Sequence, residues 1–238
     1  ESLRRTIEEQ NISHRQSFTS TIGVGIYIVI LISLFGLYLY TYRRKLLDSL
    51  RHVLFFTILM AMLICAAFLV LRHFSASYIF LIPFAWVPII TRVFYDSRTA
   101  IFIHIITVFI VSIAAPAPYV FILLQVITGI VAVISLRDMT QRAQLAQTAL
   151  FTFLMYSIVY TASTLLVTGS IANVEYNYYI YFAVNAVLVI CAYGLIFLFE
   201  RTFGLVSNIT LVELTNVNSN LMLEFAEKAP GTFQHSLQ

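Results

Sequence analysis

The sequence predicts an all-α membrane protein built as a bundle of seven transmembrane helices. Two observations carry this prediction. Of the 238 residues, 60% are hydrophobic and 11% are charged, whereas a soluble domain is about half apolar and about a quarter charged. The apolar residues also gather in seven runs, each bounded by charged or turn-forming residues. Each run reaches the roughly 17–25 residues that a helix needs to cross a bilayer.

The seven predicted spans follow one another with short connections. They cover about Thr21–Tyr40, Val53–Leu71, Ser77–Phe94, Thr99–Ala115, Tyr119–Leu136, Thr148–Val167 and Tyr178–Phe199. The first span ends at the basic run Arg43–Lys45, the second at Arg72–His73 and the third just before Asp96. Charged residues mark these ends because they are costly to place in hydrocarbon.

The remaining spans are bounded by turn-forming or polar sequences. The fourth ends at the turn Pro116–Pro118. The fifth stops at Arg137–Asp138, and the polar stretch Thr168–Glu175 separates the sixth from the seventh. The seventh ends at Arg201. Such short connections favour antiparallel packing of neighbouring helices in a single bundle.

Two prolines interrupt the third span. Pro83 and Pro88 should kink it, because proline lacks the N–H that a helix interior needs and frees backbone carbonyls at that level. A kink that shapes the bundle is the favoured interpretation, ahead of a ligand pocket at the freed carbonyls.

The basic residues gather in alternate connections. They are Arg43, Arg44, Lys45 and Arg51, then Arg92 and Arg98, then Arg137 and Arg142, and finally Arg201. The other connections hold only Arg72 and the acidic Glu175. Cytoplasmic loops carry the excess of Lys and Arg, so we expect a multi-pass membrane protein with the N-terminus outside and the C-terminus in the cytoplasm.

Three polar side chains lie inside the predicted spans, namely His104, Gln125 and Asn185. Each is expected to make an interhelical hydrogen bond. Together they could instead line a polar pocket for a small signal. Asp and Glu are absent from the span centres, and both lysines lie outside the spans, which argues against a proton pump, an ion-coupled transporter or a retinal Schiff base.

The two ends of the chain predict further parts. Residues 1–20 are polar and are expected to be the tail of an exterior domain, residues 21–200 the transmembrane module, and residues 201–238 a stalk with the beginning of a cytoplasmic domain. The stalk is expected to continue the seventh span as a helix. Because the chain begins at Glu1 without Met and stops soon after His235, it is interpreted as an excised fragment.

His235 is the candidate metal ligand. Pro230-Gly231 should end one helix, and Thr232 should cap the next, which places His235 in a first turn. The positive end of a helix favours neutral imidazole, the form that binds metal. A single histidine at a helix start is nevertheless most often not a ligand.

The strings Glu213-Leu214-Thr215-Asn216 and Glu227-Lys228-Ala229-Pro230-Gly231-Thr232-Phe233-Gln234-His235-Ser236-Leu237 resemble the opening of an HD phosphohydrolase domain. With the seven spans, the chain is similar to the bacterial seven-transmembrane proteins that carry an intracellular HD domain and hydrolyse cyclic di-AMP. This resemblance implies a multi-pass protein of the bacterial inner membrane. The resemblance implies that His235 is the first ligand of a divalent metal pair, commonly manganese or iron. The other ligands would lie beyond Gln238, so no cofactor and no catalysis are expected of this chain alone.

The favoured function is therefore a transmembrane sensory or anchoring module that couples an exterior domain to a metal-dependent phosphodiesterase through the seventh span. The expected partners are the lipid bilayer, a second copy of the chain and, for the parent protein, a cyclic dinucleotide. A nucleic acid polymer is not expected, because no basic stripe with interleaved aromatic residues occurs. The alternatives are a transporter or channel with a cytoplasmic accessory domain, and an inert anchor that serves as a dimerisation platform.

Overall fold

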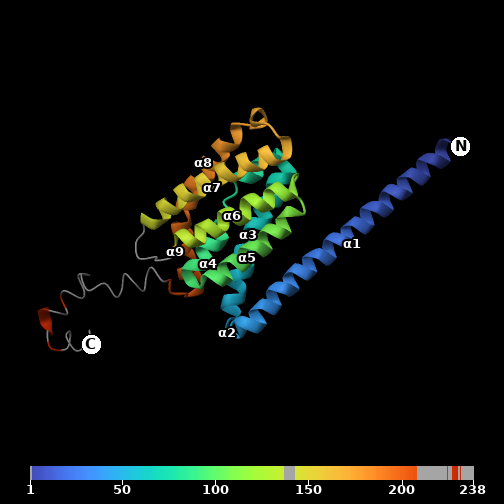
Figure 1. Ribbon diagram of the computed structural model, residues 1–238. Helices are drawn as coiled ribbons and strands as arrows, with labels where there is room; N and C mark the ends of the chain where they lie inside the picture. Colours follow the sequence, from blue (N-terminus) through green and yellow to red (C-terminus); the bar gives the residue numbers. More distant parts are fainter. Residues whose placement is uncertain (1, 137–142, 208–223, 225–226, 230, 232–238) are drawn as a thin grey trace.

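The structure is a computed structural model that describes residues 2–136, 143–207, 224, 227–229 and 231 (Figure 1). In these residues every regular element is a helix, which confirms the all-α prediction. The elements are α1 (Ser2–Tyr42), α2 (Arg44–Leu47), α3 (Leu50–His73), the 3₁₀ helix η1 (Ala76–Leu81), α4 (Trp86–Phe94), α5 (Ser97–Ser112), α6 (Pro118–Ser135), α7 (Ala143–Thr168), the 3₁₀ helix η2 (Ile171–Asn173), α8 (Asn177–Ile190) and α9 (Ala192–Phe203).

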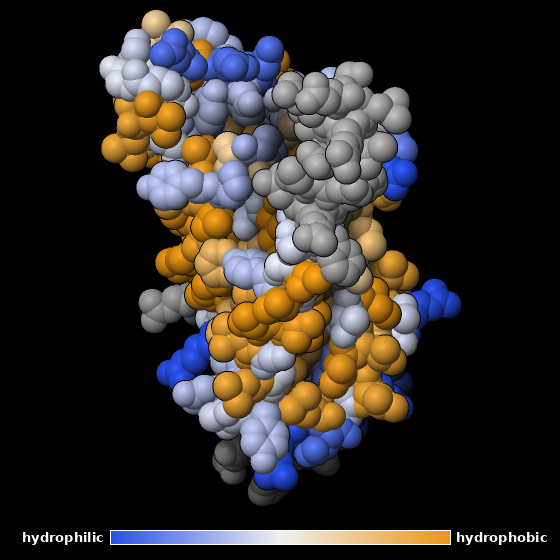
Figure 2. Space-filling view, turned by 90° about the vertical axis from the view of Figure 1, so that its right-hand side faces the viewer, coloured by the Kyte–Doolittle hydropathy of each residue, from blue (hydrophilic) through white to orange (hydrophobic). Residues whose placement is uncertain are grey.

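Helices α3 to α9 pack into one bundle, and α1 diverges from it toward the N-terminus (Figure 1). The bundle interior is filled by aromatic and aliphatic side chains, among them the fully buried Phe55, Phe84, Phe121 and Phe182. Large apolar side chains also cover its outer surface, where they form a broad hydrophobic zone between two hydrophilic ends (Figure 2). A surface of that kind is stable in lipid rather than in water.

Among the described residues, six helical segments are long and apolar enough to cross a membrane. They are Thr19–Tyr42, Leu50–His73, Ala76–Phe94, Pro118–Ser135, Gln144–Thr168 and Asn177–Phe203. The remaining segment of the predicted seven, α5, has 16 residues, which is about 24 Å at 1.5 Å per residue, against a hydrocarbon core of about 30 Å. The seven-span count therefore stays a prediction.

Helix α5 can be short because it faces protein. Ten of its 16 residues are buried, and it packs against α1, α3, α4 and α6. A helix enclosed by its neighbours does not have to match the thickness of the surrounding lipid, because the neighbouring helices meet the lipid instead.

The connections between helices gather at two ends of the bundle. Arg43, after α1, pairs with Asp96, before α5, and Arg51 lies beside Gly204, after α9. We call this the basic end. At the opposite end, Ser77 hydrogen-bonds Tyr178. Among the described residues, Arg43, Arg44, Lys45, Arg51 and Arg98 lie at this end. The assignment of that end to the cytoplasm stays a prediction.

The expected helical continuation of the seventh span is wrong. Helix α9 ends at Phe203, and Gly204 has a left-handed φ of 62° while its N–H bonds the Glu200 carbonyl. Glycine adopts this conformation without the strain that a Cβ brings, which is why it commonly terminates helices. Gly204 is therefore the residue in the sequence that indicates the end of this helix.

Candidate functional site

The third predicted span is two half-helices joined by an irregular segment. Helix η1 ends at Leu81 and α4 begins at Trp86, so Pro83 lies inside the break. Pro88 instead occupies the first turn of α4, where a backbone N–H has no partner within the helix and proline is well tolerated. The break leaves carbonyl groups that need hydrogen-bond donors inside the membrane.

Asn185 supplies those donors. Its fully buried amide, on α8, donates to the carbonyl of Phe80 at 3.0 Å and to that of Ile82 at 2.9 Å. In return Trp86, at the start of α4, donates its indole N–H to the Leu188 carbonyl of α8 at 2.8 Å. Leu188 lies just before Cys191, where α8 gives way to α9. Two interrupted spans therefore hold each other, each with a side chain bonded to the other's backbone.

A second cluster of buried polar side chains, His104, Gln125 and Tyr156, joins α5, α6 and α7. The Nε2 atom of His104 lies 2.8 Å from the carbonyl oxygen of Gln125, and because a carbonyl accepts, Nε2 carries the proton. Tyr156 donates its hydroxyl to the side-chain oxygen of Gln125 at 2.6 Å. All three side chains are buried. The imidazole fits against α6 because residue 129 is glycine, and a Cβ there would overlap the ring.

The structure thus brings together two of the three predicted pocket residues. His104 and Gln125 are in contact, whereas Asn185 bonds the η1–α4 break. Each retains one side-chain atom without a hydrogen-bond partner among the described residues, namely His104 Nδ1, Gln125 Nε2 and Asn185 Oδ1. Their bonds to protein groups account for their burial, and a shared ligand pocket stays a prediction. The sequence pattern missed Tyr156 and Trp86, because tyrosine and tryptophan are common in apolar spans without any polar role.

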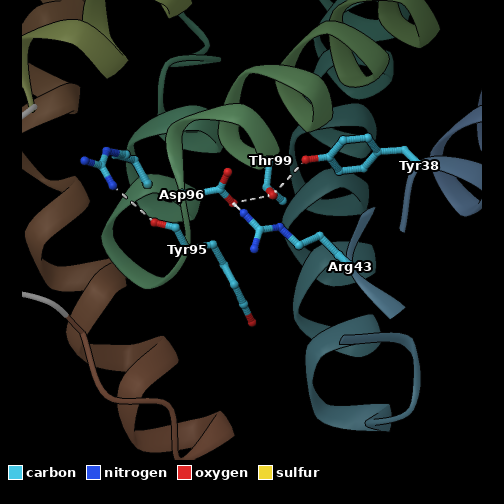
Figure 3. A network of polar contacts seen from close by, with 6 residues as sticks. Tyr38, Arg43, Tyr95, Asp96 and Thr99 are labelled. Carbon is cyan, nitrogen blue, oxygen red and sulfur yellow. Dashed lines mark hydrogen bonds and ion pairs between the residues drawn. The ribbon is translucent and has the colours of Figure 1, made fainter. Parts of the chain in front are cut away.

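A charged cluster lies at the basic end, between α1 and the α4–α5 connection (Figure 3). The Arg43 guanidinium contacts the Asp96 carboxylate at 2.5 Å, and the Thr99 hydroxyl donates to the same carboxylate oxygen at 2.6 Å. Tyr38 hydrogen-bonds Thr99 at 3.0 Å and stacks on Phe102 with ring centroids 4.2 Å apart. We call Tyr38, Arg43, Asp96, Thr99 and Phe102 the α1 latch, because they attach α1 to α5.

The latch favours the ionised form of Asp96. Burial raises the pKa of its carboxyl, but the hydrogen bonds from Thr99 and Arg43 and the charge of Arg43 outweigh it, so the pKa lies below the ordinary value of 3.8. The hydrogen bond to Asp96 likewise raises the pKa of Arg43. Both groups are therefore charged throughout the physiological range.

This electrostatic arrangement predicts the acid response of the latch. A carboxyl group whose pKa is lower in the folded than in the unfolded protein stabilises the folded state at pH values above its unfolded pKa. That contribution to the free energy of unfolding is lost as the pH falls through the pKa of the folded state. Attachment of α1 should therefore be unchanged between pH 7 and pH 5 and should weaken progressively as the pH falls below about 4. Hydrogen exchange of the α1 amides near Tyr38, measured against pH, checks this. In Asp96→Asn the same region should exchange faster than in the unaltered protein between pH 7 and pH 5, and the difference should shrink as the pH falls below about 4.

An aromatic cluster continues from the latch to the last helix. Phe55 of α3 packs against Phe94 and Tyr95, next to Asp96, with ring centroids 5.3 and 5.5 Å away. It also packs against Phe199 and Phe203 of α9 at 5.1 and 5.8 Å. The basic end therefore connects α1, the first helix of the chain, with α9, the helix that leads to the C-terminal residues.

The predicted metal ligand, His235, lies outside the described residues. Within the part of the chain that the structure describes, no group of three or more His, Cys, Asp or Glu side chains is placed to hold a metal ion. The described polar residues form sites that attach helices to one another.

The lipid-facing bundle, the interrupted spans and the basic end define a multi-pass bacterial membrane protein. The family model described as "7TM receptor with intracellular HD hydrolase" matches residues 18–207, and the chain belongs to this family. The match confirms the family resemblance in the sequence. It also places the described bundle almost wholly within the transmembrane part of that architecture.

Two curated relatives carry the same name, cyclic-di-AMP phosphodiesterase PgpH. The protein from Listeria monocytogenes serotype 1/2a (strain 10403S) is 27% identical over 230 residues, which are 90% of this chain and 31% of the relative. The protein from Bacillus subtilis (strain 168) is 28% identical over 169 residues, 66% of this chain and 23% of the relative. The chain thus spans a third or less of the length of these relatives. No solved structure matches it.

Proposed function

We propose that the chain is the transmembrane module of a cyclic di-AMP phosphodiesterase, which couples an exterior domain to a cytoplasmic HD hydrolase. The observation that carries the proposal is the family match over residues 18–207 together with two relatives named for that activity. The HD hydrolase family implies a divalent metal in the catalytic domain. We further propose a manganese or iron pair there, with His235 as one ligand, and a homodimer as the assembled form.

The structure supports a specific route for coupling. An exterior domain that precedes the first span can act on the bundle through α1, which is attached by the latch at its C-terminal end. In the α4–α5 connection, Asp96 pairs with Arg43, and its neighbour Tyr95 packs against Phe55. Phe55 in turn packs against Phe203 of α9. A shift of α1 would therefore change the packing of α9, which leads toward the hydrolase.

The latch provides the test of coupling. In the full protein, reconstituted in membrane vesicles, Arg43→Asp and Asp96→Arg should each change the rate of cyclic di-AMP hydrolysis by about two- to fivefold, since a half-exposed ion pair contributes about 1 kcal/mol or less. The double variant, which restores the pair in the reverse sense, should return the rate toward that of the unaltered protein.

The control is the isolated catalytic domain, whose rate sets the uncoupled level. Two results together would show that the spans only anchor the enzyme. The single variants would hydrolyse cyclic di-AMP at the rate of the unaltered protein, and the full protein would have the same rate as the isolated catalytic domain. Absence of cyclic di-AMP hydrolysis from the full protein would refute the proposed activity itself.

The transporter alternative has no supporting observation among the described residues. The buried polar side chains among these residues are Thr, Ser, His, Gln and Asn, and none is Asp, Glu, Lys or Arg. Charged groups inside the membrane commonly mark ion and proton pathways. A flux assay on the same vesicles, with cyclic di-AMP or inorganic ions as the solute, separates this alternative directly.

A further inference from the structure

Two open hollows adjoin the latch at the basic end. The larger, of about 550 Å³, is lined by residues 41–46 and by Phe94, Tyr95 and Asp96. The smaller, of about 430 Å³, is lined by Tyr38, Tyr42, Arg43 and Arg98. Tyr42 and Arg43 line both, so the hollows flank the same short segment that follows α1.

The charge of these hollows is unbalanced. Four cationic side chains line them, namely Arg43, Arg44, Lys45 and Arg98, against the single carboxylate of Asp96. That carboxylate is already paired with Arg43. Among the described residues, no acidic side chain forms an ion pair with Arg44, Lys45 or Arg98. Arg44 and Lys45 line the larger hollow and Arg98 lines the smaller one. Unpaired cations in two adjoining hollows lower the free energy of an anion bound between them.

The position of the hollows indicates where the anion comes from. They lie where the apolar stretch Thr19–Tyr42 ends, which is the level of the lipid headgroups. Tyr40 and Tyr42 are exposed there, and the Arg44 guanidinium lies over the Tyr40 ring at 5.3 Å. Immediately before them, α1 exposes Leu34 and Leu37, which can contact acyl chains. Tyrosine favours the membrane interface because one end of its side chain is apolar and the other polar.

We propose that the two hollows bind the phosphodiester headgroup of an anionic phospholipid. Arg44, Lys45 and Arg98 hold the phosphate, Tyr42 lies at the glycerol level, and the acyl chains run along the exposed apolar side of α1. A lipid bound there also bridges α1 and α5, since its ligands come from both sides of the latch. The proposal does not depend on the phosphodiesterase activity of the parent protein.

The test compares two double variants that remove the same charge. Lys45→Gln with Arg98→Gln removes two ligands of the proposed site. Arg72→Gln with Lys228→Gln removes one arginine and one lysine elsewhere, and both of these side chains are exposed. Each protein is purified in a zwitterionic detergent and titrated with phosphatidylglycerol, with cardiolipin and with phosphatidylcholine, and bound lipid is counted by native mass spectrometry.

The unaltered protein should bind the two anionic lipids at least tenfold more tightly than phosphatidylcholine. The Lys45/Arg98 variant should lose about 10- to 30-fold of that affinity, because each cation near a membrane surface contributes about fivefold. The Arg72/Lys228 variant should stay within twofold of the unaltered protein. Raising the salt concentration to about 0.5 M should reduce the anionic preference of the unaltered protein.

Three results would overturn the proposal. The first is equal affinity of the unaltered protein for anionic and zwitterionic lipids. The second is an equal loss in both double variants, which would indicate general attraction to the net positive charge of the chain. The third is that inorganic phosphate or cyclic di-AMP, added without lipid, raises the unfolding temperature as much as cardiolipin does, which would assign the hollows to a soluble anion.

Discussion

Replacing Asn185 with leucine should lower the free energy of unfolding by about 2–4 kcal/mol. The change removes the Asn185 donor of the Phe80 carbonyl and one of the two donors of the Ile82 carbonyl, which keeps its bond from the Phe84 N–H. An unsatisfied buried polar group costs about 1–3 kcal/mol, because the hydrocarbon core of a membrane supplies no water to replace a lost bond. The measurement is reversible unfolding in mixed detergent micelles, followed by the fluorescence of Trp86, the single tryptophan of the chain, which bonds the same helix.

The matched control for this variant is Asn173→Leu. Asn173 is exposed and lies in the short helix η2, so its replacement should change the unfolding free energy by less than about 0.5 kcal/mol. Equal effects of the two substitutions would show that Asn185 does not hold the interrupted third span, and that the η1–α4 break is stable without a partner.

Gly129→Ala should lower the stability of the bundle by about 1–3 kcal/mol. A Cβ at residue 129 overlaps the imidazole of His104, which is buried and bonded to α6 and cannot move away freely. Gly194→Ala is the control, because a Cβ there meets no atom within 4 Å. Alanine is the better helix former by about 1 kcal/mol, so the control should be neutral or stabilising.

A double variant identifies the cause. His104→Ala removes the ring that residue 129 contacts, so Gly129→Ala should cost much less in that background than alone. The coupling between the two sites should be about 1–2 kcal/mol, as for residues in direct contact. Additive effects would place the strain elsewhere in α6.

The sequence predicted the helical class and the position of most spans because long apolar runs have a single stable structure in lipid. It predicted that Pro83 would disturb the third span, but it did not identify the residue that stabilises the break. Asn185 lies more than a hundred residues away from Phe80, and such pairings follow from tertiary packing. The burial of α5 likewise could not be predicted, because it depends on which helices surround it in the bundle.

The candidate site was predicted in part. His104 and Gln125 stood out as rare polar residues in apolar runs, and the structure pairs them. The latch was missed because Arg43 and Asp96 were interpreted only as markers of span ends. The stalk was expected to continue the seventh span, but α9 ends at Phe203, before Gly204, and a glycine in the left-handed conformation is a common end of a helix.

We expect the chain to cross the membrane an odd number of times, so that α9 leads to the cytoplasmic side. Single cysteines at Ser20, Asn173 and Val206, all exposed, test it after Cys65 and Cys191 are replaced by alanine. In intact cells a membrane-impermeant maleimide should label Ser20→Cys and Asn173→Cys, and it should label Val206→Cys only after permeabilisation. Labelling of Ser20→Cys and Val206→Cys from the same side would contradict the account.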